Sequence, residues 1–368
     1  MIGWEDIYKV VVSMVPLYVA LGLGYASVKW WRMFKPDQCD AINRFNCYFI
    51  LPFFTFHFTS GVNPYRMNYR FLAGDVIAKA IAGATLALWA NLWREGNFSW
   101  AITSFSLSSL NNTLVVGVPL LGAMYGPVGQ DLVVQSSVIQ ALLWFPLLLF
   151  MLEFRRSVGF NSDDLAQTQQ QQKQSCSDIE IVVTDDHVNT NDKHENQNNT
   201  DASIKTESTL CSSSSYNMGS TIIKVLARLA RNPNSYACAL GLIWALLEKR
   251  WKFEMPSIVE GSVMIMAKAG SGVAMFSMGL FMALQKKVIA CGVRLSMYGM
   301  LLRFVGGPLT TAIGSLALGL RSNILRIAII QSMACTLTYS ALRRVIFGTI
   351  VSLPLLIAYY AVLDVLHI

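Results

Sequence analysis

The stretch LNNTLVVGVPLLGAMYG, residues 110–126, lies within the mostly apolar run 100–125, which is long enough to cross a lipid bilayer. Its middle nevertheless carries two asparagines, a threonine, a glycine and a proline. Asn112 lies near the midpoint of the run, where a polar side chain is costly unless it meets partners or water. Pro119 lacks a backbone donor and Gly117 loosens the helix. The pattern predicts a helix that breaks inside the membrane, where the freed backbone groups line a cavity.

A helix broken in this way can bind an anion. The amino-terminal end of a half-helix offers unpaired N–H groups and the positive end of the helix dipole, both of which suit a carboxylate. A kinked helix whose asparagines bond to neighbouring helices explains the same residues equally well. The residues of this span alone leave both interpretations open.

The rest of the chain is equally apolar. Charged residues are 14% of the sequence and hydrophobic residues 54%, whereas soluble domains contain roughly 25% charged residues. A large soluble helical core would need polar faces, which most of the apolar runs lack. We therefore predict an all-α integral membrane protein with about ten transmembrane helices, at residues 7–28, 41–60, 70–93, 100–125, 131–153, 234–250, 258–284, 292–318, 324–342 and 345–365.

One polar segment divides the chain. Residues 157–221 are rich in Ser, Asn, Asp, Thr and Gln and cannot bury enough apolar surface to fold, so a disordered loop is expected there. Five predicted spans lie in residues 1–156 and five in residues 222–368. Because five is odd, the second half enters the membrane from the opposite face. Two inverted repeats, a common plan among transporters, are the expected arrangement.

Basic residues orient the protein. They are more frequent beside the ends of the spans that share a side with the loop, which predicts a cytosolic loop and both termini on the other side. The net charge of +7 is then explained by membrane orientation, and no nucleic-acid partner is expected. The seven cysteines form no CxxC pair, so neither a disulfide framework nor a metal site is expected. The absence of a P-loop, HExxH or GxSxG sequence argues against an enzyme and against a cofactor.

Several long stretches resemble one family, the PIN-FORMED auxin efflux carriers of plants, and the resemblance covers nearly all of both halves. The stretches are MVPLYVALGLGYASVKWW (14–31), DQCDAINRF (37–45), NTLVVGVPLL (112–121), RNPNSYA (231–237), AMFSMGLFMALQ (274–285) and SLPLLIAYY (352–360).

The resemblance implies two inverted five-helix repeats, each with a scaffold part, a transport part and a broken fourth helix. The implied function is transport of indole-3-acetate by alternating access. Two alternatives are a carrier of another organic acid and a transport-incompetent membrane partner or receptor. The short loop resembles the group associated with the endoplasmic reticulum membrane, which implies transport from cytosol to lumen; the plasma membrane is the less expected location. Membrane lipid is an implied partner, and a homodimer is compatible with the sequence.

The resemblance also implies site residues. Asn112 matches the asparagine thought to bind the substrate carboxylate, and Leu114 follows it in the same motif. Leu51 matches an aliphatic residue that lines the pocket, Thr55 replaces the usual serine, and Asn234 matches the asparagine that opens the second repeat. Neutral amides and helix ends hold an anion without a full positive charge, and aliphatic residues suit the face of an indole ring.

A second set of residues matches the family's scaffold or support positions. Asp75 and Lys79 are spaced so that they can face each other on one helix, and Gln140 joins them by resemblance. A buried ion pair that only fixes packing is the competing interpretation. Arg303 also lies within a predicted span, where a charged side chain is expected to be paired or to reach the membrane surface.

Two departures from the family pattern bear on function. The family proline before the asparagine is replaced by Asn111, so the break depends more on Gly117, Pro119 and the amide side chains. The mirror segment SMACTLTYSALRR, residues 332–344, lacks the expected proline-containing crossover. We therefore expect the second repeat to be truncated there and the chain to transport poorly or not at all. A splice form, a misassembled gene and a degenerate paralogue all remain open.

Overall fold

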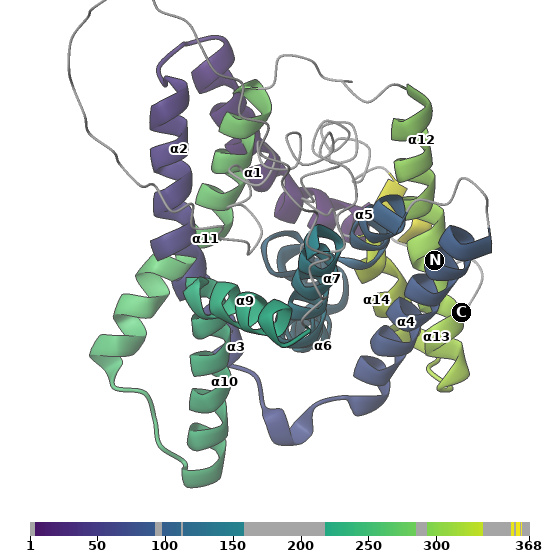
Figure 1. Ribbon diagram of the computed structural model, residues 1–368. Helices are drawn as coiled ribbons and strands as arrows, with labels where there is room; N and C mark the ends of the chain where they lie inside the picture. The colour runs from purple at the N-terminus through teal and green to yellow at the C-terminus, as the bar shows by residue number, and fades with distance from the viewer. Residues whose placement is uncertain are drawn as a thin grey trace, which may run out of the picture.

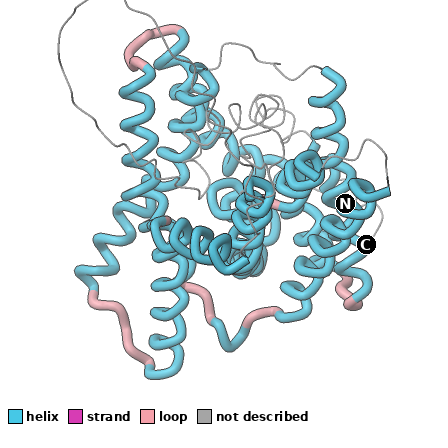
Figure 2. The backbone as a smooth tube through the Cα atoms, in the orientation of Figure 1, coloured by secondary structure: helices cyan, strands magenta, loops and turns pink. Residues whose placement is uncertain are grey.

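The computed structural model describes residues 4–92, 98–111, 113–157, 218–284, 293–333, 355–356, 358–360 and 362. Within these ranges the backbone forms helices joined by short connections, and no strand occurs among them (Figures 1 and 2). The prediction of an all-α protein is confirmed. Only the two ends of the predicted loop, 157 and 218–221, fall within the described residues, and both are helical.

The first half contains seven α-helices, several of which continue into one another through a π-helical turn. They are α1 (Trp4–Lys29), α2 (Pro36–Phe45), the π turn Asn46–Ile50, α3 (Leu51–Ser60), α4 (Tyr69–Leu92), α5 (Phe98–Ser109), the π turn Thr113–Gly117, α6 (Val118–Ile139), the π turn Gln140–Trp144 and α7 (Phe145–Ser157). A single 3₁₀ turn, Pro64–Arg66, lies between α3 and α4.

The second half follows a similar plan. Its helices are α9 (Met218–Arg231), α10 (Pro233–Trp251), α11 (Ser257–Leu284), α12 (Val293–Leu301), the π turn Leu302–Gly306, α13 (Gly307–Ala317) and α14 (Ser322–Met333). Helix α14 covers the beginning of predicted span 324–342. The rest of that span and most of 345–365 lie outside the described residues, as does the expected loss of the second crossover beyond Met333.

Five helical stretches are long and apolar enough to cross a membrane, judged by length and composition in the described part of the chain: Tyr8–Lys29, Tyr69–Leu92, Ala101–Phe154, Ser257–Leu284 and Met297–Ala317. The third contains two of the predicted spans. They are separated at Gly126, whose φ of 65° and ψ of −153° reverse the chain inside α6. Glycine adopts a positive φ without steric cost, which explains its use at this corner.

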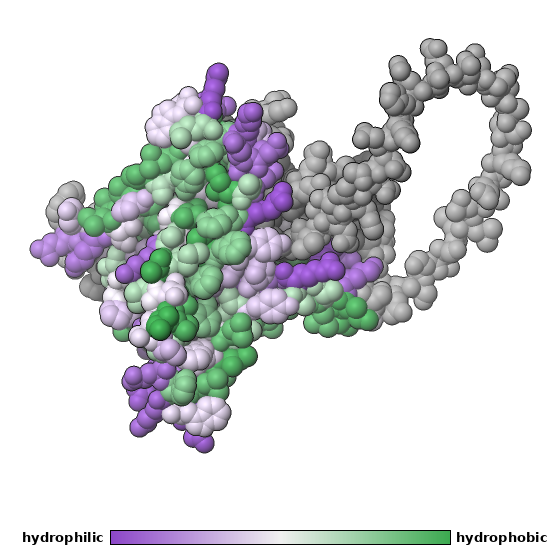
Figure 3. Space-filling model, turned by 90° about the vertical axis from the view of Figure 1, so that its left-hand side faces the viewer, coloured by the Kyte–Doolittle hydropathy of each residue, from purple (hydrophilic) through white to green (hydrophobic). Residues whose placement is uncertain are grey.

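The outer surface is apolar, as a lipid-facing surface must be. On α1, Tyr8, Val12, Val15, Val19 and Leu23 are exposed and recur every three or four residues, which places them on one face. Figure 3 shows the side of the molecule that lies on the left of Figure 1; apolar residues cover most of it and hydrophilic residues lie mainly near its rim.

The helices form two outer groups with a middle group between them (Figure 1). Helix α1 packs along α11, α10 packs along α3, and α3 also contacts α11. On the other side α4 packs along α13. Helix α6 lies between the groups and contacts α1, α4 and α14.

Glycines lie at the main helix contacts, where the neighbouring helix leaves no room for a Cβ atom. A Cβ atom on Gly314 of α13 would lie 2.8 Å from the nitrogen of Ala78 and 2.8 Å from the carbonyl oxygen of Gly74, both on α4. A Cβ atom on Gly241 of α10 would lie 2.9 Å from the Cβ of Thr59 on α3. Small residues let helix backbones approach closely, which favours association in a membrane through van der Waals contact.

Prolines explain the π-helical turns. Each of the four π turns in the described residues is followed two residues later by a proline: Pro52, Pro119, Pro146 and Pro308. Proline lacks an N–H and its ring clashes with the carbonyl group four residues earlier. A wider turn at that carbonyl relieves the clash while the helix continues, so these helices bend instead of ending.

Candidate functional site

The fourth predicted span is interrupted in its middle. Helix α5 ends at Ser109, Leu110 and Asn111 are not helical, and helical structure resumes at Thr113. Leu110 and Asn111 are both buried. Asn112, the central predicted site residue, lies outside the described residues.

The break is not at Gly117 and Pro119, where the sequence places it. Gly117 has helical dihedral angles, φ −67° and ψ −41°, and Pro119 lies in the first turn of α6. The π turn absorbs the effect of the proline, so the helix continues through both residues. The carbonyl oxygen of Pro119 instead accepts a hydrogen bond from Ser13 Oγ of α1 at 2.8 Å.

Gln140 holds the break together. Its side-chain Nε2 donates to the carbonyl oxygen of Asn111 at 2.6 Å, and its Oε1 accepts from the backbone nitrogen of Asn111 at 3.1 Å. Both residues are buried. The amide of Gln140 thus replaces the backbone partners that Asn111 loses where the helix is interrupted, and an unpaired peptide group at this depth would be costly.

Arg303 donates hydrogen bonds to the carbonyl groups at the carboxyl-terminal end of α5. Its Nη1 donates to the carbonyl oxygens of Leu107 at 3.2 Å and Leu110 at 3.1 Å. These carbonyl groups belong to the last turn of α5 and the residue after it, which have no helical partners. A cation at a helix carboxyl terminus also complements the negative end of the dipole. Arg303 is therefore buried and bonded, and it does not reach the membrane surface.

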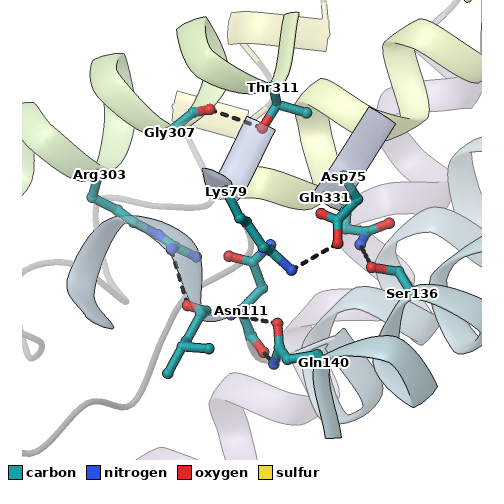
Figure 4. Close-up of polar contacts among 10 residues, drawn as sticks. Asp75, Lys79, Asn111, Ser136, Gln140, Arg303, Gly307, Thr311 and Gln331 are labelled. Atoms are coloured by element: carbon teal, nitrogen blue, oxygen red, sulfur yellow. Dashed lines mark hydrogen bonds and ion pairs between the residues drawn. The ribbon is translucent and has the colours of Figure 1, made fainter. Parts of the chain in front are cut away.

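Asp75 and Lys79 form a buried ion pair on α4. Lys79 Nζ lies 2.8 Å from Asp75 Oδ2. The Lys79 side chain is only 6% exposed and the Asp75 side chain only 12%. The same nitrogen lies 5.7 Å from the ring centroid of Trp144, which ends the π turn that begins at Gln140. This distance is within the range of a cation–π contact. Figure 4 draws the ion pair together with Gln140, Asn111 and Arg303.

The second half of the chain contributes one more polar contact to this region. Gln331 Nε2 of α14 donates to Ser136 Oγ of α6, and both residues are buried (Figure 4). Gln331 is two residues before the last described residue of α14. The two half-structures are thus joined close to the place where the second crossover is expected.

Of the remaining predicted residues, Leu114 lies in the π turn that follows the break, Leu51 and Thr55 lie on α3, and Asn234 lies on α10. Leu51 and Leu114 are buried in the same apolar core, which is built mainly from α1, α6, α11 and α14. Thr55 Oγ1 of α3 donates to Asn234 Oδ1 of α10 at 2.6 Å, and both side chains are buried. The structure therefore brings Asp75, Lys79 and Gln140 together beside the break, and it pairs Thr55 with Asn234 at the α3–α10 contact.

The α3–α10 pair is not remote from the break. Cys238, one turn after Asn234, packs against Val138 and Ala141, which flank Gln140 on either side. Helix α10 thus contacts the same segment that supports Asn111.

The contacts of Asn111 and Gln331 were not predicted from the sequence, whereas Arg303 is paired, as one of its two expected outcomes required, through partners that the sequence did not identify. A signal for each was present, because a polar or charged side chain within an apolar span requires a partner. The partners themselves lie far away in sequence, so only the fold reveals them.

Comparison with known proteins assigns the family. A family described as "Membrane transport protein" matches residues 9–360. The chain is 48% identical to "Auxin efflux carrier component 5" of Arabidopsis thaliana, over 100% of both chains. The chain belongs to the auxin efflux carrier family of membrane transport proteins. It is a multi-pass membrane transporter and not an enzyme.

Other relatives extend this result. "Probable auxin efflux carrier component 5c" of Oryza sativa subsp. japonica is 45% identical over 99% of both chains, and "Auxin efflux carrier component 8" of Arabidopsis thaliana is 33% identical over 99% of this chain and 100% of the relative. The alignment with component 5 extends over 380 positions for a chain of 368 residues. The alignment therefore contains only a few positions that have no counterpart in this chain.

Proposed function

We propose that this auxin efflux carrier family member transports indole-3-acetate, as the anion, by alternating access. The observation that carries the proposal is the full-length match, at 48% identity, to a relative named as an auxin efflux carrier component. The match extends over both halves, which gives no support to the alternative of a transport-incompetent partner or receptor, nor to the expectation that the chain transports poorly or not at all. A carrier of another organic acid would use the same fold, and ligand competition separates the two.

The proposed anion site is the interruption between α5 and α6. Asn112 is proposed to bind the carboxylate, next to the helical segment that begins at Thr113 and presents its N–H groups. Leu114 and Leu51, both buried, are proposed to contact the indole ring. An apolar lining with a few placed polar groups is the usual composition of a small-molecule site.

Asp75, Lys79 and Gln140 are proposed to support this site. Gln140 bonds to both sides of the Asn111 peptide group, the residue next to Asn112. Lys79 places a positive charge near the same segment, and Asp75 balances that charge when no substrate is bound. Because Asp75 balances the charge of Lys79, the pair adds little net attraction for the anion, so it does not hinder release.

Thr55 and Asn234, which are hydrogen-bonded to each other across the two halves, are proposed as further substrate-binding residues. Asn234 Nδ2 is buried and has no hydrogen-bond partner in the described part of the protein. A buried amide donor in this state gains a hydrogen bond if a carboxylate oxygen or a water molecule reaches it. Asn234 can therefore accept a hydrogen bond from Thr55 and donate one to the substrate at the same time.

Two inverted repeats, 1–156 and 222–368, are the proposed architecture. Exchanging the first two spans of the halves maps the α1–α11 contact onto the α10–α3 contact, and both contacts are extensive. The α3–α11 contact maps onto itself under this exchange, and the α4–α13 contact maps onto itself when the third spans are exchanged as well. One group, held together by the α1–α11, α3–α10 and α3–α11 contacts, is proposed as the scaffold part. Asp75, Lys79 and Gln140 lie outside this group, so they are proposed to support the site and not to belong to the scaffold.

The proposed location is the endoplasmic reticulum membrane, with transport from cytosol to lumen. The alignment with component 8 extends over 384 positions, whereas that with "Probable auxin efflux carrier component 1d" of Oryza sativa subsp. japonica extends over 556. The chain thus lacks a long segment that some relatives have. Membrane lipid and a homodimer are proposed partners; the exposed apolar face of α1 offers a surface for either.

Replacing Asn112 tests the proposed site. Asn112→Ala should weaken binding of indole-3-acetate to the purified protein by about 1–3 kcal/mol, the value of one hydrogen bond to a charged group. Expression and thermal stability should stay at the level of the parent. Equal affinity in the variant and the parent would remove Asn112 from the site without affecting the assignment of the chain as a carrier.

A further inference from the structure

Helix α9, Met218–Arg231, has no role in the proposed transport cycle. It has 14 residues and directly precedes α10. About 20 apolar residues are needed to cross a bilayer, so α9 is too short to span one, and Lys224 lies in its middle.

The helix has three distinct sides. Val225 is buried and faces the protein, where α9 packs on α7. Ile222, Ile223 and Leu226 are 43%, 67% and 56% exposed and lie on a second side. Lys224 and Arg231, seven residues apart and therefore close to the same side of a helix, are both exposed.

Two contacts hold α9 in place. Arg228 Nη1 lies 2.9 Å from Glu153 Oε2 of α7, a carboxylate whose side chain is only 9% exposed. At the other end Asn232 is extended, with φ −87° and ψ 110°, and its Oδ1 accepts a hydrogen bond from the backbone nitrogen of Asn234 at 3.0 Å. Pro233 then begins α10, and a residue before proline is disfavoured in the helical conformation. The chain therefore turns a corner here, and α9 lies crosswise to α10 (Figure 1).

We propose that α9 is an in-plane membrane helix that binds anionic phospholipid where the central loop joins the second half of the carrier. A helix at the end of a membrane span meets the headgroup layer of the bilayer. Ile222, Ile223 and Leu226 insert at the boundary of the acyl chains, and Lys224 and Arg231 contact lipid phosphates. This division of apolar and basic sides is typical of helices that lie on anionic membranes.

The charge of α9 favours lipid over a protein partner. Its described ionisable residues are all basic, namely Lys224, Arg228 and Arg231, and Arg228 is already paired within the protein. Each lysine or arginine near an anionic surface contributes a free energy equivalent to about a fivefold change in binding. The ion pair with Glu153 keeps α9 against α7, so the bound lipid is positioned at a fixed place on the carrier.

Photo-crosslinking and hydrogen exchange test the proposal on the full chain in nanodiscs. A photo-reactive amino acid at position 223 or 226 should crosslink to phospholipid, and one at position 225 should crosslink within the protein. Amide exchange of residues 218–231 should be slower in phosphatidylcholine discs that contain phosphatidylserine than in discs without it. Lys224→Gln with Arg231→Gln should reduce that difference, by about fivefold for each charge removed.

A matched control uses the far end of the next helix. Lys249 and Arg250 are also exposed, in the last turn of α10, and Lys249→Gln with Arg250→Gln removes the same charge. This control should leave exchange of 218–231 unchanged. Crosslinks from 223 and 226 to a second copy of the chain, or exchange that is insensitive to phosphatidylserine, would overturn the proposal. Neither result depends on which solute is transported.

Discussion

Single side chains at the interrupted helix replace the bonds that the interruption removes. The side-chain amide of Gln140 bonds to both the N–H and the carbonyl oxygen of Asn111, and Arg303 bonds to carbonyl groups at the end of α5. Asp75 and Lys79 form a neutral pair beside them. These hydrogen bonds favour one arrangement of the backbone, because breaking them would leave further buried polar groups unpaired.

Variants of the Asp75–Lys79 pair distinguish a role in packing from a role in transport. Lys79→Met leaves the Asp75 carboxylate buried and uncompensated, so the variant should lose about 3–5 kcal/mol of stability. The double variant Asp75→Leu with Lys79→Met should regain most of this, because replacing both charges removes the uncompensated one. Thermal unfolding in detergent measures both effects.

Transport by the double variant then gives the role of the pair. We expect slower uptake of indole-3-acetate than by the parent, because the Lys79 ammonium and its Asp75 partner no longer support the break. Uptake at the parental rate by the stable double variant would show that the pair serves packing alone.

Whole helices are placed by close backbone contact and bent by prolines. Gly314 of α13 faces the backbone of α4, and this contact orients the helix that carries Asp75 and Lys79. The π turns before Pro52, Pro119, Pro146 and Pro308 let four helices bend without ending. The turn at Gln140–Trp144 contributes both Gln140 and Trp144 to the surroundings of the break.

Alanine at two glycines tests the contact between α4 and α13. Gly314→Ala should destabilise the protein by about 1–3 kcal/mol, because the new Cβ overlaps the α4 backbone. Gly272→Ala on α11 is the control: its Cβ would meet nothing within 4 Å, and alanine favours a helix over glycine. The melting temperatures of the two variants measure this difference. Equal melting temperatures would show that α4 and α13 leave room for a Cβ atom at position 314.

Local sequence patterns predicted the helices well and their contacts poorly. The apolar runs 7–28 and 258–284 correspond closely to α1 and α11. A break within 100–125 was expected from Asn112 and Pro119, but it lies at Leu110 and Asn111, because a π turn accommodates the proline.

The local sequence patterns did not predict helix α9 or the hydrogen bond between Thr55 and Asn234. Helix α9 extends into the predicted loop, whose overall composition concealed the helical spacing of Ile222, Val225, Leu226 and Leu229. The pairing of Thr55 with Asn234 joins residues far apart in the chain, and no local pattern carries that information.

At the scale of the whole molecule, an apolar face contrasts with a buried polar site. The exposed residues of α1 and the face in Figure 3 suit lipid, whereas Leu110 and Asn111 at the interrupted helix are buried. Pairing of α1 with α11 and of α10 with α3 joins the two halves, so movement of one part against the other is the expected route of transport.

Topology follows from the basic flanks of the spans. Tags at residue 190 and after Ile368 should lie on opposite sides of the membrane, with residue 190 in the cytosol. Protease access in sealed microsomes measures this. Protection of both tags, or cleavage of both, would rule out ten spans and would indicate that the last two segments do not form a hairpin.

The most direct measurement is transport by the unmodified chain. Purified protein in proteoliposomes should take up labelled indole-3-acetate in a saturable way, at a pH well above the pKa of the acid, where passive entry of the neutral form is small. Unlabelled indole-3-acetate should compete more strongly than aliphatic acids, and Asn112→Ala should reduce the rate. Uptake by the folded chain no faster than by protein-free vesicles would contradict its assignment as an auxin carrier.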